Sequence, residues 1–186
     1  MSLRNINAKS WMRIAAVMAL AGLTAGCFQP LYGERSLAGG ASMRDALAAV
    51  EIQQIDAPPG DARARMAVEL RNELQFALRG GNGSMPATHS LKINITDGRS
   101  SIIVDPTTAR AEYEIISLDA TYTLIDLKTG KPVFTSTATA RTSYDVPGQQ
   151  NRYAMLRGQR NAQGKATTVI AEQIRNRLAS HLAAGT

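Results

Sequence analysis

The sequence predicts an α+β domain in which two helices pack on one face of a four-stranded mixed or antiparallel sheet, in the order β-α-β-β-β-α. Two stretches carry apolar residues at every fourth position, the pattern of amphipathic helices. Other stretches alternate apolar and polar residues or gather β-prone ones, as strands do. Each element has a single apolar side, and two helices on one face of a sheet bury all of these sides together.

The first strand is predicted at residues 48–55, where apolar and polar residues alternate loosely. Pro58-Pro59-Gly60 then breaks the chain, and Asp61 is a suitable helix N-cap. A helix of about five turns follows, and Gly80-Gly81 ends it as C-cap glycines do. The apolar stripe of this helix is Met66, Leu70, Leu74 and Leu78.

A half-buried strand is predicted at residues 91–95, where Leu and Ile alternate with polar residues. Asp97-Gly98 is expected to interrupt it. The apolar run Ile102-Ile103-Val104 leaves two alternatives open. It either extends the preceding strand or presents an exposed apolar tip, which would mark a partner site.

An antiparallel hairpin and a final helix complete the domain. The hairpin pairs residues 116–124 with residues 133–144 across a turn at residues 128–131. The final helix extends to Ala184, and its interior glycines leave its first residue undetermined, because each costs about 1 kcal/mol relative to Ala. Its apolar stripe is Ile170, Ile174, Leu178 and Leu182.

The N-terminal segment has the pattern of a lipoprotein signal peptide. A cationic lead-in is followed by the short apolar run 14–23, the small residues Ala25-Gly26 and then Cys27, the only cysteine. A membrane-spanning helix needs about 20 apolar residues, which this run lacks. A buried core helix does not usually begin with unpaired cations. We therefore expect cleavage before Cys27, which would carry S-diacylglycerol and an N-acyl chain.

This interpretation divides the chain into three parts: a signal peptide at residues 1–26, a lipidated N-terminus and tether at 27–45, and one domain at 46–186. Removal of the signal lowers the net charge from +6 to +3, because three cations and no acid leave with it. So small a surplus excludes a typical nucleic-acid-binding surface. Several acyl chains together make a stable membrane anchor.

The sequence predicts no catalytic site, no metal site and no cofactor apart from the covalent lipid. His89 and His181 stand singly, without a second ligand at metal spacing. No serine lies in a Gly-x-Ser-x-Gly elbow. Gly80 to Gly83 follow a helix and lack the Lys-Ser/Thr of a phosphate loop. The protein is therefore predicted not to be an enzyme.

The basic residues have two interpretations. They are either solvated charges that keep a tethered domain soluble, or a surface that binds lipid phosphates, with which Arg and Lys pair well. One group lies at expected strand ends and turns, and a second follows the last strand. The residues concerned are Arg99, Arg110, Lys128, Lys131, Arg141, Arg152, Arg157, Arg160 and Lys165.

The chain resembles the lipopolysaccharide (LPS)-assembly lipoproteins of the LptE family, particularly their alphaproteobacterial members. The resemblance begins with Cys27 followed by residues 28–33, FQPLYG. It continues with residues 105–110, DPTTAR, which lead into residues 118–126, LDATYTLID. Residues 129–133, TGKPV, and the helical residues 170–178 complete it. These short motifs follow one another in order over nearly all of the expected mature chain.

The resemblance implies an outer-membrane lipoprotein on the periplasmic side, with two helices on a four-stranded sheet. It also implies a plug inside the LPS-assembly barrel LptD, which assists barrel assembly and delivery of LPS to the outer leaflet. A strand face rich in Thr, at Thr135, Thr137 and Thr139, suits the polar lumen of a barrel. The candidate contacts for LPS phosphates are Arg99, Arg110, Lys128 and Lys131.

A second class of protein shares several of these features. An accessory lipoprotein of an ABC-type lipid transporter, or a secretin pilot, would have the same signal, size and lack of catalytic residues. Residues 28–33 together with residues 105–126 favour the LPS interpretation. Co-purification of a large barrel would distinguish the two.

Overall fold

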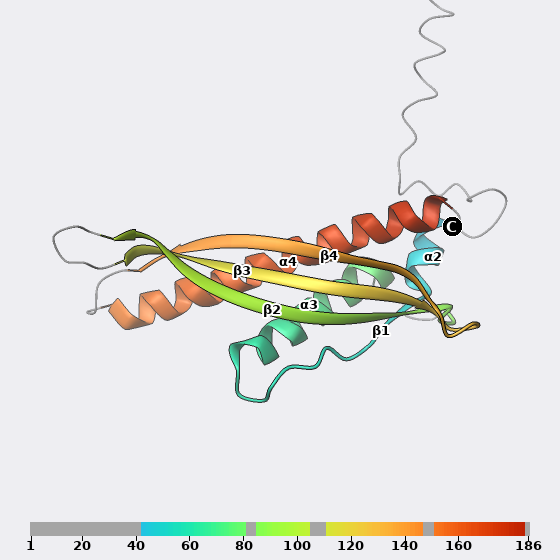
Figure 1. Ribbon diagram of the computed structural model, residues 1–186, viewed down its shortest axis with the longest axis horizontal. Coiled ribbons are helices and arrows are strands. Elements are labelled where there is room, and N and C mark those ends of the chain that lie inside the picture. The colour runs from blue at the N-terminus through green and yellow to red at the C-terminus, as the bar shows by residue number, and fades with distance from the viewer. Residues whose placement is uncertain (1–41, 81–84, 105–110, 147–150, 185–186) are drawn as a thin grey trace, which may run out of the picture. The chain divides into compact units, whose positions relative to one another are not determined.

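The computed structural model describes residues 42–80, 85–104, 111–146 and 151–184. Their elements follow one another in the order α2-β1-α3-β2-β3-β4-α4 (Figure 1). The predicted order β-α-β-β-β-α is therefore confirmed, and one short helix, α2, precedes it. The predicted signal peptide and most of the predicted tether lie outside the described residues.

Helix α2, Met43–Ala48, is held at its start by a reciprocal pair of bonds. The Ser42 hydroxyl accepts from the Asp45 backbone N–H at 3.2 Å, and the Asp45 carboxylate accepts from the Ser42 N–H at 3.3 Å. Met43 and Leu47 are buried in the core. The sequence analysis did not predict this helix, because six residues are too few to give a periodic apolar pattern.

The four strands lie in the order β1-β2-β3-β4, which is also their order in the chain. They are β1, Val50–Ile52; β2, His89–Val104; β3, Ala111–Asp126; and β4, Pro132–Asp145. β1 runs parallel to β2, because helix α3 carries the chain back between them, whereas the other two pairings are antiparallel. The sheet is therefore mixed.

Strand β2 continues through Asp97-Gly98, so the predicted interruption is wrong. Asp97 pairs with Leu118, and Gly98 pairs with Ser117. The long partner strand β3 supplies these pairings, which outweigh the weak strand preference of Asp and Gly. The pairing is irregular only further along, between Ser101 and Val104. Of the two alternatives for residues 102–104, the strand extension is the one observed.

Helix α3, Ala62–Arg79, has the predicted ends. Asp61 is its N-cap, and its carboxylate accepts from the Arg63 N–H at 3.3 Å. Gly80 is the C-cap, with a left-handed φ of 59°, and its N–H donates to the Phe76 carbonyl at 2.8 Å. The predicted apolar stripe of this helix is fully buried.

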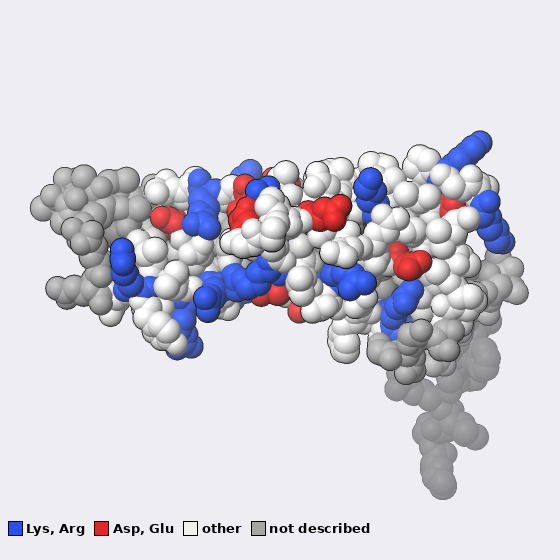
Figure 2. Space-filling view, turned by 90° about the horizontal axis from the view of Figure 1, so that it is seen from below, with Lys and Arg blue, Asp and Glu red and all other residues white. Residues whose placement is uncertain are grey.

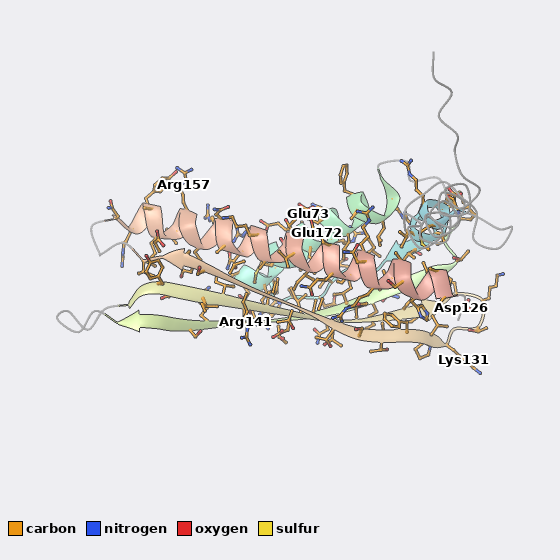
Figure 3. The ribbon with its side chains drawn as sticks, turned by 90° about the horizontal axis from the view of Figure 1, so that it is seen from above. Glu73, Asp126, Lys131, Arg141, Arg157 and Glu172 are labelled. Carbon is orange, nitrogen blue, oxygen red and sulfur yellow. The ribbon has the colours of Figure 1, made fainter. Side chains whose placement is uncertain are left out.

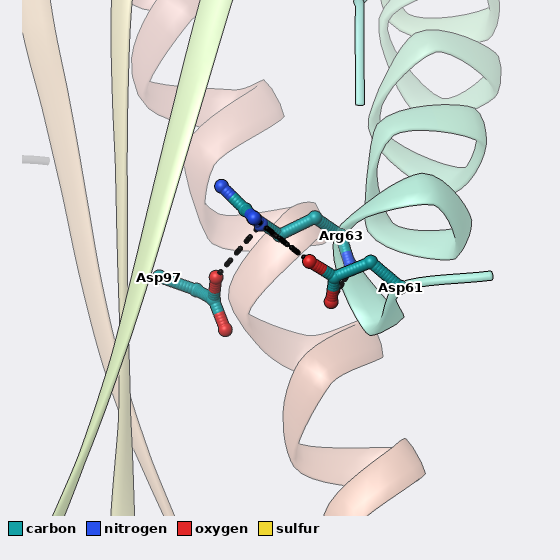
Figure 4. Close-up of polar contacts among 3 residues, drawn as sticks. All are labelled: Asp61, Arg63 and Asp97. Atoms are coloured by element: carbon teal, nitrogen blue, oxygen red, sulfur yellow. Dashed lines mark hydrogen bonds and ion pairs between the residues drawn. The ribbon is translucent and has the colours of Figure 1, made fainter. Parts of the chain in front are cut away.

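An ion-pair bridge ties the start of α3 to the sheet (Figure 4). Arg63 Nη2 lies 2.8 Å from Asp61 Oδ2, and its Nε lies 3.5 Å from Asp97 Oδ1 on β2. All three side chains are partly exposed, so the bridge contributes modestly to stability. Its main effect is to fix where α3 begins over the sheet.

Helix α4, Arg152–Ala184, is continuous through Gly158 and Gly164 and packs on the same side of the sheet as α3 (Figure 3). Ile170, Ile174 and Leu178 are fully buried, as predicted, and Leu182 packs against the edge of the core. None of the helices in the described part of the chain is long and apolar enough to cross a membrane.

The core lies between the sheet and these helices. Tyr122 at its centre is fully buried and lies 6.1 Å from the Phe134 ring, centroid to centroid. The His181 ring stacks on Phe134 at 4.6 Å.

Candidate functional site

One face of the sheet is left uncovered by the described helices and is polar. Helices α3 and α4 lie on one side of the sheet (Figure 1). Alternation along β2, β3 and β4 directs their apolar side chains toward these helices and most of their hydroxyl side chains to the opposite side. The open sheet face, as we call it, consists mainly of Asn94, Thr96, Thr121, Thr123, Thr135, Thr137 and Thr139.

Threonine hydroxyls pair across this face. Thr121 Oγ1 lies 3.3 Å from Thr137 Oγ1, and Thr123 Oγ1 lies 3.2 Å from Thr135 Oγ1. Cross-strand Thr pairs stabilise a sheet, and β-branched residues suit an exposed strand surface. The surface is thus rich in hydrogen-bonding groups, and Lys92, Asp119 and Arg141 add charges of both signs to it. Such a surface fits contact with another polar surface.

Arg99 faces α4 rather than the open sheet face. The Gln159 side-chain amide forms hydrogen bonds when its oxygen is directed toward the Arg99 guanidinium. In this orientation the oxygen accepts from Arg99 Nη2 at 2.7 Å and from Arg99 Nη1 at 3.2 Å. The partner is neutral, so the positive charge of Arg99 is not neutralised by this bond. Arg99 itself remains exposed.

Lys128 and Lys131 lie at the turn between β3 and β4 and are exposed. The Asp126 carboxylate organises this turn, accepting from the Lys128 N–H at 2.7 Å and from the Thr129 hydroxyl at 3.2 Å. The backbone bond from Lys128 and the bond from Thr129 lower the pKa of Asp126. Gly130 completes the turn with a left-handed φ of 67°.

The structure does not bring the predicted phosphate contacts together. Arg99 pairs with Ile116, whereas the turn that carries Lys128 and Lys131 begins after Asp126, ten residues further along β3. That corresponds to roughly 33 Å of strand. The lipid attachment site Cys27 and the candidate contact Arg110 lie outside the described residues.

A stronger concentration of positive charge lies on the first half of α4. Its described side chains include four cations and no acid before Glu172. Arg157 points away from the sheet, 5.9 Å above the exposed ring of Tyr153 (Figure 3). Lys and Arg side chains gather along this helix side of the molecule (Figure 2). The cations are Arg152, Arg157, Arg160 and Lys165.

Sequence reasoning named these four cations as a group that follows the last strand, but it did not choose them as LPS contacts, and the glycines at 158 and 164 obscured where α4 begins. Arg152 lies in the first turn, where a cation opposes the helix dipole, and the other three cations lie beyond the reach of this effect. The helix dipole therefore gives no reason for the arrangement. The available signal was the run of 20 residues from Arg152 without an acid.

Tyr144 fixes the end of β4 beneath α4. Its hydroxyl donates to the Glu114 carboxylate on β3. Burial, together with the bond to Glu114 and the negative charge of Glu114, raises the pKa of Tyr144 to about 12. The phenol therefore stays neutral at physiological pH and acts as a hydrogen-bond donor rather than as an acid.

A groove runs between the end of β4 and the first half of α4. It consists of two shallow hollows, of about 700 and 390 Å³, which share Asn161 and Lys165 in their linings. Arg160 and Thr142 line the larger hollow, and Ser143 lines the smaller. Cationic, amide, hydroxyl and carboxylate groups thus surround a space at the edge of the sheet, and the carboxylates are those of Asp145 and Glu172.

These features match a known family. The family model described as lipopolysaccharide-assembly, LptE, matches residues 47–182, which include all of the sheet, all of α3 and nearly all of α4. The chain belongs to the LptE family. The predicted resemblance is thereby confirmed, and a role in LPS assembly follows from it. No curated protein sequence matches the chain at a significant level.

Solved structures share the fold of this LptE-family domain. A candidate lipoprotein from Caulobacter crescentus CB15 is similar with a TM-score of 0.62 and 24% identity, over 77% of this chain and 97% of that one. A minor lipoprotein from Acinetobacter baumannii is similar with a TM-score of 0.52 and 16% identity, over 71% of this chain and 90% of that one. Both likenesses concern the fold alone.

Proposed function

We propose that this LptE-family protein is an outer-membrane lipoprotein, anchored on the periplasmic side through acylated Cys27. In this proposal it occupies the lumen of an LptD-type β-barrel as a plug, helps that barrel to assemble and takes part in delivering LPS to the outer leaflet. It does so without catalysis. The observation that carries the proposal is the family match over residues 47–182.

The open sheet face supports a position inside a barrel. Lumens of outer-membrane barrels are polar, and a plug must offer them polar groups without a large charge. The paired hydroxyls of Thr121 and Thr137, and of Thr123 and Thr135, provide such a surface. Because these residues are held on paired strands, their positions change little on binding.

LPS contact is part of the same proposal. Arg99, Lys128 and Lys131 are exposed cations, and Arg110 belongs to the predicted set. Guanidinium and ammonium groups bind phosphate oxygens through charge-assisted hydrogen bonds. Since Arg99 lies far along the sheet from the two lysines, we propose that they contact separate phosphates rather than form one site.

A pull-down in mild detergent tests the barrel partnership. The full-length protein carries a C-terminal tag, and the proteins that co-purify are identified by mass spectrometry. A stoichiometric barrel of the LPS-assembly type is the expected result. A monomer, or a complex with inner-membrane transporter subunits, would contradict the proposal and support the transporter-lipoprotein alternative.

Variants at Thr121 sharpen this test. Thr121→Arg places a long cation on the open sheet face and should reduce the recovery of the barrel, because the lumen would have to accommodate an unpaired charge. Thr121→Ser keeps the hydroxyl and is the matched control. Equal recovery with both variants would show that this face does not contact the barrel.

A further inference from the structure

The outer edge of β4 is only partly covered by α4. β4 is last in the sheet, so one side of its backbone has no strand partner in the described part of the chain. The side chain of Gln173 pairs with the Thr139 backbone, accepting from its N–H at 3.3 Å and donating to its carbonyl at 3.1 Å. Arg177 donates to the Thr137 carbonyl at 2.6 Å. α4 thus occupies the middle of this edge.

These bonds identify which residues direct their backbone outward. Along an antiparallel strand, residues bond alternately to the partner strand and to the outside. The pairing of β3 with β4 is regular through this stretch. Since the backbone groups of Thr137 and Thr139 point outward, those of Arg141 and Ser143 point outward as well. Among the described residues, neither the outward N–H nor the outward carbonyl of Arg141 or Ser143 has a hydrogen-bond partner.

The helix presents small residues to this uncovered part of the edge. A Cβ on Gly158 would lie 3.8 Å from the Asp145 carbonyl oxygen and 3.5 Å from the Tyr144 ring. Ala154 lies one turn earlier in α4 and lines the same hollow. In the described part of α4, no side chain bonds to the Arg141 or Ser143 backbone as Gln173 bonds to that of Thr139. The groove lies beside this stretch of β4.

Cations line the middle of the groove. Arg160 and Lys165 line it from α4, whereas the Arg141 side chain lies on the other face of the sheet, away from α4 (Figure 3). The carboxylates in the lining are Asp145 and Glu172, one at either end. An unpaired strand edge binds an extended polypeptide as an additional strand, and the surrounding cations favour one that carries acidic residues.

We infer that the edge of β4 at Arg141 and Ser143 binds an extended, acidic segment of the barrel partner as a fifth strand. The identity of the partner rests on the proposed function; the nature of the contact rests on the edge and the groove. A second copy of this chain is the weaker occupant, because pairing two β4 edges would bring the Arg160 and Lys165 cations of both copies together.

Two proline variants test this contact in the purified protein and the barrel encoded in the same genome. Ser143→Pro removes an outward N–H inside the groove, whereas Val133→Pro places a proline at the irregular start of the same strand, outside the groove. Proline is tolerated at outward-facing positions of edge strands and at bulges. We expect Ser143→Pro to weaken binding of the barrel at least about tenfold, through lost backbone bonds and steric conflict, and Val133→Pro to leave it nearly unchanged.

Hydrogen exchange of the unmodified protein gives an independent readout that needs no variant to fold. On binding, the Arg141 and Ser143 amides should change from fast to slow exchange, whereas the Thr135 amide stays fast. The Ala140 and Thr142 amides, which face β3, should be slow in both states. The double change Arg160→Glu and Lys165→Glu should also weaken binding.

The outcomes separate the two proposals. If the unmodified protein does not bind the barrel at all, both the proposed function and this contact fail. If it binds the barrel, and neither the proline variant nor amide exchange at Arg141 and Ser143 responds, the proposed function stands and the edge contact is refuted. Protection that depends on protein concentration without the barrel would identify a second copy as the occupant and refute the acidic segment.

Discussion

Single polar side chains determine where the helices of this domain begin. At the start of α2, the side chains of Ser42 and Asp45 each accept a hydrogen bond from the other's backbone N–H. At the start of α3, the Asp61 carboxylate accepts from the Arg63 backbone N–H. The hydrogen bonds from Arg63 lower the pKa of Asp61 below its ordinary value of 3.8. The carboxylate is therefore favoured in the folded state, and its effect on stability depends on pH.

Replacing Asp61 with Ala should destabilise the protein at neutral pH and have progressively less effect in acid. A carboxyl whose pKa is lowered by folding stabilises above its unfolded pKa, and this contribution is lost as the pH falls through its folded pKa. Urea unfolding at pH 7 and below pH 4 measures the difference. Asp61→Asn keeps the cap but loses the ion pair with Arg63, and its free energy of unfolding should be close to that of the unmodified protein. A loss of stability in Asp61→Ala that does not depend on pH would contradict this account.

At the scale of an element, α4 contains two glycines in different surroundings. Nothing lies within 4 Å of the position that a Cβ on Gly164 would take, whereas a Cβ on Gly158 would contact the Tyr144 ring at 3.5 Å. Glycine in a helix interior is less favourable than Ala by about 1 kcal/mol. Gly158 permits a close approach of α4 to β4, but no packing contact explains Gly164.

Gly164→Ala should therefore stabilise the protein by about 0.5–1 kcal/mol. The new methyl group meets open space, and the unfolded chain loses conformational freedom. The free energy of unfolding in urea checks this, and Gly158→Ala is the comparison. Gly158→Ala should not be stabilised more than Gly164→Ala, because its new methyl group must fit against Tyr144. A loss of stability in Gly164→Ala would mean that the helix bends at this residue.

At the scale of the whole molecule, α3 and α4 cover one face of the sheet and leave the other polar. Ile174 and Leu178 of α4 are fully buried, together with Leu70 and Leu74 of α3 and Tyr122 of the sheet. These side chains join the elements into one core, and each fully buried aliphatic side chain contributes about 1.5–3 kcal/mol.

Ile174→Ala should destabilise the whole domain by about 2–5 kcal/mol, because the removed atoms leave a cavity between α4 and the sheet. Val169→Ala, on the exposed side of the same helix, should change stability by at most about 0.5 kcal/mol. Thermal or urea unfolding followed by circular dichroism compares the two. Similar small effects would mean that α4 contributes little to the core.

Most of the fold followed from patterns that are local in the chain. The spacing of Met66, Leu70, Leu74 and Leu78 predicted α3 and its buried side, since helical periodicity depends only on neighbours within a few residues. Local patterns did not predict the features that depend on pairing between distant segments or on very short elements. β2 continues through Asp97-Gly98 because β3 holds it, and α2 is too short for any periodicity to reveal.

The functional surfaces divide in the same way. The sequence by itself determined that Thr135, Thr137 and Thr139 share one strand face, and its motifs identified the LptE family. Only the tertiary structure decided that Arg99 lies far from Lys128 and Lys131, and that Arg160 and Lys165 face an unpaired part of β4. The physical reason is that such groupings depend on the register of the strands and the placement of α4 against them, which are set by packing between segments distant in the chain.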